Sequence, residues 1–351
     1  MQIPVPIIII NWRGIEDTLE CMESVLQQEY IDFHVHLVDN GSEDHSPDVL
    51  KEKFSKHEKV SLHLLPDNLG FTGGNNLIMD NLLKQYSDTE LPQIILLNND
   101  TTVEKNWLKN LVAAAEETGA GMVSSRMVYY YDRKLMDNAG HYMLNTGEIL
   151  PVGYFQPPDH YNQRTENMGA CGGAVLYNTQ MLRDIGLFDD HFSTGYEDAE
   201  LGLRAVVCQY TCIYEPTAIV YHKGGQSLKK VRNLDYLVNI QSHILYTYFK
   251  LMPDKFLLQN MPLLFARYLM IFTFDLLFIR KKYLIMHSKA WWLLLTKNFR
   301  EGRRKRKILF QNRKIADSKE LFKKVEFFWH TDAKRLRDYL RTFWQNKEVS
   351  R

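Results

Sequence analysis

The sequence has few cysteines, and none of them forms a CxxC pair. The four cysteines are Cys21, Cys171, Cys208 and Cys212. Their spacing indicates neither a zinc ribbon nor a disulfide scaffold. A chain with so few thiols and no disulfide pattern is expected in a reducing, cytoplasmic setting.

Other common signals are also missing. The N-terminus, Met1-Gln-Ile-Pro, has no basic segment ahead of its first apolar run, so no signal peptide is expected. We find no internal repeat and no low-complexity linker. The chain has neither a Walker phosphate loop nor a GxGxxG fingerprint, so the sequence does not support an ATPase or a nicotinamide-dependent enzyme.

What the chain does contain is enough apolar sequence for a large folded core. It has 351 residues, of which 45% are hydrophobic and 12% aromatic. Its net charge of +1 conceals an asymmetry, because residues 255–351 carry a net charge of +16 and residues 1–254 carry −15. We therefore predict an acidic domain over 1–254 and a basic region over 255–351.

The first part of the chain repeats a strand, a polar loop and a helix four times. Such repetition predicts a parallel α/β sheet with right-handed crossovers, in which the polar loops meet at the carboxyl edge of the sheet. Asp17 and Glu20 suggest a capping box for the first helix. The predicted strands are Val5–Ile10, Phe33–Val38, Val60–Leu65 and Gln93–Leu97, and the later helices lie near Pro47–Phe54, from the Asn68–Asn76 loop to Gln85, and over Asn106–Glu117.

The pattern changes near residue 120, which divides the predicted domain into two halves, about 1–120 and 121–254. Strands are predicted in the second half with short helices between them, and residues Gly147–Asn167 are expected to be irregular. The strands are Gly121–Tyr129, Leu135–Leu144, Gly169–Tyr177 and Cys212–Tyr221, and the helices are Asn178–Asp184 and Ala199–Tyr210.

Two adjacent carboxylates, Glu197 and Asp198, follow a Gly-Tyr turn and precede the last of these helices. They are candidates for a reactive group beside an anionic ligand. The alternative is that acidic residues at this point only complement the helix dipole.

Further carboxylates end two of the predicted strands. Asp100, in Asn98-Asn-Asp100, is suited to hold one divalent ion whose other ligands are waters and phosphate oxygens, or it forms an Asx turn. Asp39 is suited to accept hydrogen bonds from a base or a ribose, or it is a turn former.

Glycine-rich stretches and one histidine complete the candidates. Three glycines in Asn68–Asn76 allow close approach of the backbone to a ligand. His222, just past a strand end, is either structural or a metal or pyrophosphate contact. Gly172 and Gly173 either pack closely or leave room for a sugar. His222 begins the polar, glycine-containing stretch that follows the last predicted strand and continues to Ser227.

Taken together, these stretches resemble glycosyltransferase family 2, whose members are inverting enzymes with the GT-A fold. The likeness covers about residues 4–227 and is greatest to the bacterial rhamnosyltransferase-like branch. The matching motifs are Ile7-Ile-Ile-Ile-Asn-Trp12, Val38-Asp-Asn-Gly-Ser42, Asn68-Leu-Gly-Phe-Thr-Gly-Gly-Asn75, Leu97-Asn-Asn-Asp-Thr101, Gly172-Gly-Ala174, Gly195-Tyr-Glu-Asp198 with Leu201 and Arg204, and Tyr221-His222.

The resemblance implies a role for each matching residue. Asp198 would be the general base, with Glu197 beside it. Asp100 and His222 would hold Mg²⁺ or Mn²⁺ on the donor pyrophosphate. The residues implied for the donor nucleotide are Asn11, Asp39, Asn68, Gly70, Gly74, Asn75 and Asn99, and those for the sugar and acceptor pocket are Gly172, Gly173, Tyr196 and Arg204.

The resemblance also implies the reaction: a single sugar moves from a nucleoside-diphosphate donor, either dTDP-rhamnose or a UDP-sugar, to a lipid-linked or cell-surface glycan. No QxxRW motif is found, which favours single addition over chain synthesis. The family's metal-binding DxD motif reads Asn98-Asn99-Asp100 in this sequence, so its first carboxylate is missing. A non-catalytic sugar-nucleotide-binding or scaffold protein of the same fold therefore remains an alternative, and a nucleotidyltransferase is a weaker one.

The basic C-terminal region is predicted to form amphipathic helices. Phe256–Ile279 is apolar but contains Arg267 and Asp275, whose burial in a membrane would cost about 2.5–3.5 kcal/mol each. Aromatic residues beside basic clusters suit an anionic membrane surface, here the inner face of the plasma membrane. The alternatives are a bundle on the catalytic domain, a homo-oligomer interface or a solvated face. No nucleic-acid-binding module accompanies the charge.

Overall fold

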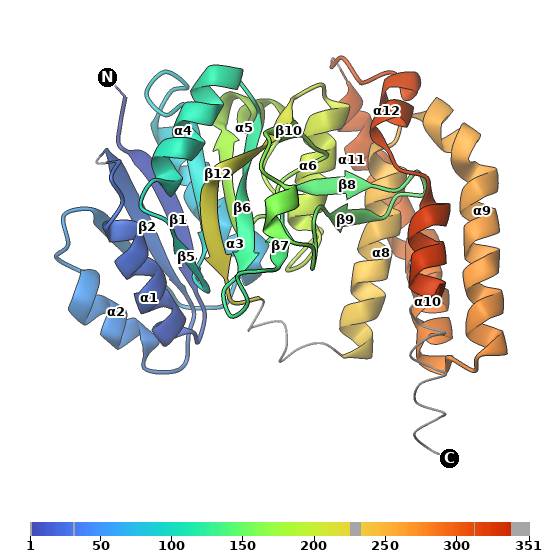
Figure 1. Cartoon of the computed structure of the whole chain (residues 1–351), viewed down its shortest axis with the longest axis horizontal. Helices are drawn as coiled ribbons and strands as arrows, with labels where there is room; N and C mark the ends of the chain where they lie inside the picture. The colour runs from blue at the N-terminus through green and yellow to red at the C-terminus, as the bar shows by residue number, and fades with distance from the viewer. Residues whose placement is uncertain (1, 31, 225–232, 312, 338–351) are drawn as a thin grey trace.

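The computed structural model describes residues 2–30, 32–224, 233–311 and 313–337. Its centre is one large twisted sheet in the order β10-β12-β6-β11-β4-β1-β2-β3 (Figure 1). The strands are β1 (Val5–Asn11), β2 (Phe33–Asn40), β3 (Val60–Leu65), β4 (Gln93–Asn98), β5 (Thr101–Val103), β6 (Met122–Tyr129), β7 (Met136–Asn138), β8 (His141–Met143), β9 (Ile149–Pro151), β10 (Thr165–Glu166), β11 (Ala174–Asn178) and β12 (Cys212–His222).

Strands β1 to β4 are parallel, as the repeated strand–helix pattern predicted. β11 is antiparallel to both β4 and β6, and β12 runs parallel to β6. The register pairs Asn11 with Asp39 across β1 and β2, and Ile10 with Asn98 across β1 and β4. The polar ends of three strands therefore share one edge of the sheet.

Helices cover both faces of the sheet because alternate strand residues point to opposite sides. Ile7 and Ile9 belong to the core under α1 and α4, whereas Ile8 belongs to the core under α3, α5 and α6. These cores are why the apolar strands are buried on both faces. The helices are α1 (Ile15–Leu26), α2 (Ser46–Phe54), α3 (Gly70–Gln85), α4 (Trp107–Thr118), η1 (Pro158–His160), α5 (Thr179–Ile185) and α6 (Glu197–Val207).

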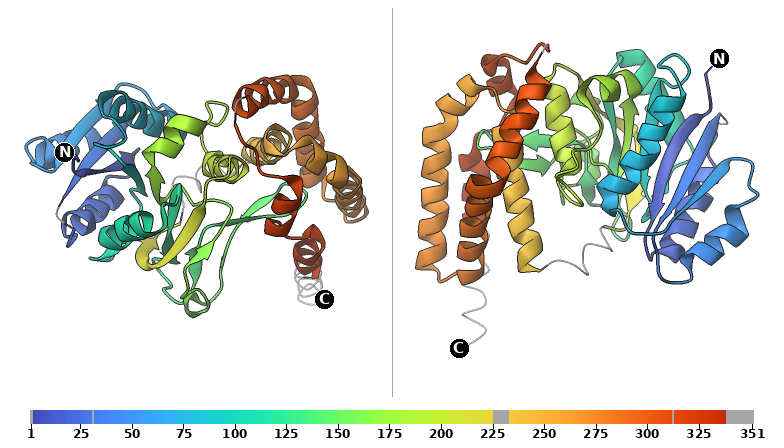
Figure 2. Two further views of the ribbon diagram at one scale, coloured as in Figure 1. Left: turned by 90° about the horizontal axis from the view of Figure 1, so that it is seen from above. Right: turned by 180° about the vertical axis from the view of Figure 1, so that it is seen from behind.

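The C-terminal helices form a separate layer beside α6, as Figures 1 and 2 show. α8 is the helix of this layer nearest the sheet domain: it contacts α6 as well as α10 and α11. The predicted boundary at 254 thus falls after α8, inside the helical layer. The layer contains α8 (Leu234–Leu251), α9 (Asp254–Leu277), α10 (Lys281–Leu293), the π-helical turn η2 (Leu294–Asn298), α11 (Phe299–Phe310), α12 (Ser318–Lys324) and a helix over 328–337.

Several predicted elements differ from the structure. The Gly-rich stretch is the first turn of α3, since the helix begins at Gly70. The strand predicted over Leu135–Leu144 is two short strands, β7 and β8, and the strand predicted from Gly169 begins only at Ala174. The helix predicted over Ala199–Tyr210 begins two residues earlier, at Glu197, so both carboxylates belong to it.

The predicted capping box of α1 is also wrong. Gly14 occupies the N-cap, and no side chain caps this end of the helix. Asp17 and Glu20 instead accept hydrogen bonds from Lys223, at 2.6 and 2.5 Å. This pairing joins α1 to the residue after β12, about 200 positions away, and local spacing carried no sign of it.

The β8–β9 hairpin extends from the sheet domain into the helical layer (Figure 2). Its turn is held there by Arg267 of α9, whose guanidinium bonds Thr146 at 2.8 Å and Glu148 at 2.6 Å. Arg267 also pairs with Asp332 at 2.7 Å. The guanidinium that argued against a membrane span is therefore buried and satisfied within the protein.

One helix among the described residues, α9, is long and apolar enough to cross a membrane by length and composition. Buried core helices meet the same criterion. α9 forms the outer edge of the molecule in Figure 1, and it exposes an apolar stripe at helical spacing. The stripe consists of Leu258, Met261, Phe265, Leu269 and Leu276, which are 40–77% exposed.

Candidate active site

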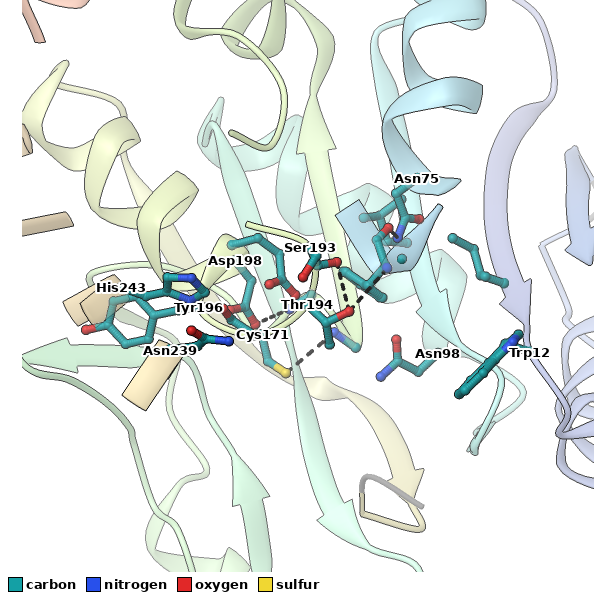
Figure 3. Close-up of a pocket in the computed structure, with 18 of the residues that line it drawn as sticks. Trp12, Asn75, Asn98, Cys171, Ser193, Thr194, Tyr196, Asp198, Asn239 and His243 are labelled. Carbon is teal, nitrogen blue, oxygen red and sulfur yellow. Dashed lines mark hydrogen bonds between the residues drawn. The ribbon is translucent and has the colours of Figure 1, made fainter. Parts of the chain in front are cut away.

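A cavity of about 750 Å³ opens at the carboxyl edge of the sheet. It is lined by the ends of β1, β2 and β4, the start of α3, residues 171–173, His222 at the end of β12, the turn before α6, and the helices α8 and α10 with the π turn. Figure 3 shows Trp12 and Asn98 at one end of the cavity, with Asn239, His243 and Tyr196 at the other. We call the first the strand side and the second the helix side.

On the strand side, the two residues expected to contact the nucleoside bind each other. Asn11 donates to Asp39 at 2.6 Å, and both are almost fully buried. Asp39 also accepts from the backbone of Ser42 at 2.9 Å. Neither side chain lines the cavity, but their chain neighbours Trp12 and Asn40 do.

Asn40 organises the Gly-rich turn. Its amide donates to Asn68 Oδ1 at 3.1 Å and to the carbonyl of Gly70 at 3.0 Å, and it accepts from the backbone of Leu69. Gly70 has a φ of +72°, and a Cβ there would lie 2.6 Å from the carbonyl oxygen of Ser193. Only glycine allows the start of α3 to approach the turn before α6 so closely.

The remaining predicted donor residues occupy different places. Asn75 and Asn99 line the cavity, Asn75 bonding the carbonyl of Phe71 and Asn99 bonding Thr18 at 2.9 Å. Asn68 and Gly70 also line it. Gly74 packs instead under the strands, because a Cβ there would lie 2.9 Å from Ile10 Cδ1.

The predicted metal ligands Asp100 and His222 face each other across the strand ends. His222 Nε2 lies 3.3 Å from Asp100 Oδ1, and its Nδ1 lies 2.7 Å from Asp137 Oδ2. Burial by itself lowers the pKa of His222, but its contacts with Asp100 and Asp137 outweigh burial and raise the pKa to about 10. Asp137, on β7, was not predicted, because it lies in a stretch read as plain strand.

The donor set fits a divalent ion. Two neighbouring ligands bound about 2.1 Å from one ion lie roughly 3 Å apart, which matches the His222–Asp100 separation. Asp137 would orient the imidazole from behind, as carboxylates commonly do at metal sites. A bound ion would have to displace the imidazole proton, since a histidine ligand is neutral.

The predicted catalytic pair begins α6. Asp198 accepts from the backbone of Gly172 at 2.9 Å, and both residues line the cavity. Glu197 is 6% exposed, and its Oε2 has no hydrogen-bond partner among the described residues. Burial, together with the charge of Asp198, raises the pKa of Glu197 to about 8. Glu197 therefore largely keeps its proton at neutral pH.

The predicted pocket residues divide into two groups. Gly172, Gly173 and Tyr196 line the cavity, and the Tyr196 hydroxyl accepts from the backbone of Ile149 in the β8–β9 hairpin at 2.9 Å. Arg204 does not line the cavity. Its guanidinium bonds Glu200 at 2.6 Å and the carbonyls of Ile185, Gly186 and Leu187, so the structure gives it a place in the core.

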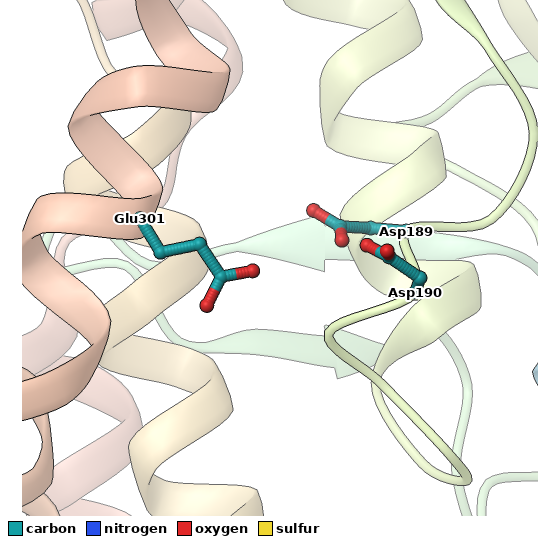
Figure 4. A group of neighbouring side chains, drawn as sticks. All are labelled: Asp189, Asp190 and Glu301. Carbon is teal, nitrogen blue, oxygen red and sulfur yellow. The ribbon is translucent and has the colours of Figure 1, made fainter.

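A second acidic group lies away from the cavity. Asp189 and Asp190, from the loop before α6, face Glu301 of α11 (Figure 4). Lys305 pairs with all three carboxylates, with Glu301 at 3.0 Å, and Lys250 pairs with Asp189. Ammonium groups thus already neutralise this cluster, which joins the helical layer to the sheet domain.

The helix side of the cavity was missed by sequence reasoning. Seven residues, which we call the α8 wall, line it: Tyr236, Asn239, Ser242 and His243 of α8, with Leu293, Lys297 and Asn298 of α10 and the π turn. No motif marks them, and the predicted boundary at 254 separates the first four from the last three. The part of the predicted polar stretch after Gly224, as far as Ser227, lies outside the described residues.

The sequence profile of glycosyl transferase family 2 matches residues 7–186, just over half of the chain. Relatives with curated names include the O-antigen biosynthesis protein RfbC of Myxococcus xanthus, 24% identical over 67% of this chain and 19% of that protein. The succinoglycan biosynthesis protein ExoO of Rhizobium meliloti is 24% identical over 66% of this chain and 64% of its own length. The chain thus spans under two thirds of these relatives.

Solved structures show the same fold at low identity. GalNAc-T7, solved with UDP, GalNAc and Mn²⁺, superposes with a TM-score of 0.55 at 14% identity, covering 74% of this chain and 54% of that one. The mannosyltransferase PcManGT of Pyrobaculum calidifontis, solved with GDP-Man and Mn²⁺, gives 0.50 at 14% identity over 88% and 85%. The predicted GT-A fold is confirmed.

Proposed function

Because the chain belongs to glycosyl transferase family 2, we propose that it is an inverting glycosyltransferase that adds a single sugar to a lipid-linked or cell-surface glycan. The observation that carries the proposal is the position of Asp198 in one cavity with Asp100 and His222. A proton acceptor and a candidate metal site thus share the space that donor and acceptor would occupy.

Each side of the cavity has a part in the proposed reaction. The acceptor hydroxyl oxygen attacks the anomeric carbon from the face opposite the nucleotide, and the bond from that carbon to the phosphate oxygen breaks. Asp198 takes the hydroxyl proton, and the nucleoside diphosphate leaves with the electron pair. Asp100 and His222 would hold Mg²⁺ or Mn²⁺, which supplies charge stabilisation on the departing diphosphate. Trp12 is placed to stack on the nucleotide base.

The donor is proposed to be dTDP-rhamnose or a UDP-sugar. The solved neighbours hold UDP or GDP-Man with Mn²⁺, which supports a nucleotide-sugar donor without selecting its base. Thermal stabilisation by dTDP, UDP and GDP, each with and without Mn²⁺, would identify it, because a ligand stabilises the native state by about RT ln(1 + [L]/Kd).

The role of Asp198 is tested by Asp198→Asn. Removal of a general base lowers the rate by about 10²–10⁴-fold, while nucleotide binding should survive. The matched control is Asp80→Asn on the surface of α3, where Asp80 pairs with Lys84 at 2.5 Å. Near-normal turnover in Asp198→Asn would contradict the assignment. Loss of transfer with normal nucleotide affinity would support the assignment over a non-catalytic binding protein, the alternative left open by Asn98 in the place of a carboxylate.

We also propose that the enzyme acts in the cytoplasm at the inner face of the plasma membrane, docking through the outer stripe of α9. Polysaccharide-synthesis relatives and the exposed apolar residues of α9 support this placing. The full chain should float with vesicles that contain phosphatidylglycerol. Phe265→Ser with Leu269→Ser should abolish flotation, whereas Leu64→Ser, a 45% exposed leucine on β3, should not. Equal flotation of all variants would contradict membrane docking through α9.

A further inference from the structure

The α8 wall places helices of the C-terminal layer directly opposite the strand side of the cavity. α8 packs on the turn that carries the proposed base: His243 lies 3.1 Å from the carbonyl of Gly195, and a Cβ on Gly195 would lie 2.8 Å from Ile240. Gly195 has a φ of +88°, so the turn is shaped for this contact. The wall therefore borders the space on the acceptor side of Asp198.

The π turn is fixed to this wall. Asn298 donates to Ser242 at 2.9 Å, and both side chains are buried. π-helical turns are rare and often occur at functional sites. Here the turn presents Lys297, which precedes Asn298, to the cavity.

Lys297 is notable for its charge. Asp100, Glu197 and Asp198 also line the cavity, yet Lys297 is the one lysine or arginine among its described lining residues. It forms no ion pair or hydrogen bond with the part of the chain that the structure describes, whereas nearby Lys250 and Lys305 are bound to carboxylates. An ammonium group in this position is available to an anionic ligand.

The helix surface near Lys297 is apolar. Leu293 lines the cavity. Trp292 and Leu295, next to Leu293 in the sequence, do not line the cavity but are 68% and 69% exposed on the surface outside it. A ligand on the α8 wall would therefore meet hydroxyl-binding groups near Asp198, then a cation, then an apolar surface. A sugar joined through a phosphate to a lipid has this order of chemistry.

We infer that the α8 wall is the acceptor subsite and that Lys297 binds the phosphate of an isoprenoid-phosphate-linked sugar. The inference rests on the proposed glycosyl transfer and adds the chemical class of its acceptor. Asn239 and His243, which Figure 3 shows beside Tyr196 and Asp198, would contact the sugar. Lys297 would position the acceptor without touching the reacting atoms.

The test uses the full-length protein saturated with its preferred nucleoside diphosphate and Mn²⁺, so that the donor site is filled. Binding of farnesyl phosphate, farnesol and inorganic phosphate is then measured by calorimetry. Farnesyl phosphate should bind most tightly. Lys297→Ala should weaken it roughly 10-fold, as expected for loss of a charge-assisted hydrogen bond. Lys289→Ala, an exposed lysine on α10 outside the cavity, should leave it unchanged.

Equal affinity for farnesyl phosphate in Lys297→Ala and the wild type would overturn the inference, as would binding of inorganic phosphate or farnesol as tight as that of farnesyl phosphate. Nucleotide affinity provides a separate readout. Weaker nucleotide binding in Lys297→Ala than in Lys289→Ala would assign Lys297 to the donor and overturn the inference. If the wild type bound no nucleotide, the proposed function itself would fail, and the acceptor inference with it.

Discussion

The two sides of the cavity differ in how the chain builds them. The strand side comes from successive strand–helix units within about 100 residues, whose loops meet because parallel strands end at one edge. The α8 wall comes from helices after residue 233, joined to the site by packing and by isolated hydrogen bonds. The strand side is therefore built by a repeated local pattern, whereas the α8 wall depends on contacts between segments that are distant in the sequence.

The largest expected effect comes from weakening the contact between the helical layer and the sheet domain. Lys250 of α8 is 4% exposed and pairs with Asp189 and with Glu200 of α6, the latter at 2.6 Å. Lys250→Met leaves Asp189 paired with Lys305 and Glu200 paired with Arg204. Because breaking a buried pair typically costs about 3–5 kcal/mol and these partners remain, we expect a loss near the lower end of that range. Chemical and thermal unfolding should show that loss.

The control for Lys250→Met is Lys84→Met, which removes an exposed pair with Asp80. Exposed pairs contribute about 0–1 kcal/mol, so this variant should unfold almost as the wild type does. Similar stability in the two variants would mean that the buried network does not hold the layers together.

The next effect concerns the strand side alone. Asp100→Asn removes the carboxylate that faces His222 and should lower transfer by about 10²-fold or more. Nucleoside diphosphate binding should lose its dependence on Mn²⁺, which calorimetry can measure. Farnesyl phosphate binding at the α8 wall should change little, and a parallel loss there would show that the two sides are not independent.

A smaller effect is expected from Asp137, which contacts the candidate metal ligand His222. Asp137 bonds His222 Nδ1 at 2.7 Å, and removal of such an orienting partner commonly costs about 10–100-fold in metal affinity or activity. Asp137→Asn should therefore weaken Mn²⁺-dependent nucleotide binding less than Asp100→Asn does. The reverse order would exclude Asp100 as the main ligand.

The smallest effect is a pH dependence of stability from Glu197. Its pKa is raised from 4.5 to about 8 in the folded state, so folding takes up a proton between these values. The stability contributed by the protonated carboxyl is complete below pH 4.5 and is lost as the pH rises through 8. Relative to Glu197→Gln, the wild type should lose a few degrees of apparent Tm between pH 5 and 9. A constant difference across that range would contradict the raised pKa.

The sequence was informative where signals are local. Apolar runs located β1 to β4 within one or two residues, and polar residues at their ends identified Asn99 and Asp100 at the cavity. The resemblance also implied site roles for Arg204 and Gly74, but neither residue lines the cavity. A motif match does not reveal which way a residue faces.

The contacts of the helical layer make truncation at residue 254 a poor test of what this layer does. α8 packs on α10 and α11, and Lys305 of α11 pairs with Asp189 of the sheet domain. A chain cut at 254 would expose these surfaces and leave Asp189 with fewer partners. Point substitutions in the full chain are therefore the better test of membrane contact.

By itself, the sequence determined the parallel strands β1 to β4, the polar residues at their carboxyl ends and the two carboxylates that begin α6, because periodicity and turn chemistry act over a few residues. Only the tertiary structure decided that Asp137 supports His222, that Lys223 joins α1 to β12, and that α8 and the π turn close the cavity. Those pairings join residues from about 60 to 200 positions apart. Burial and charge compensation in the packed core select these partners. Neither produces a regular spacing along the sequence from which the pairing could be predicted.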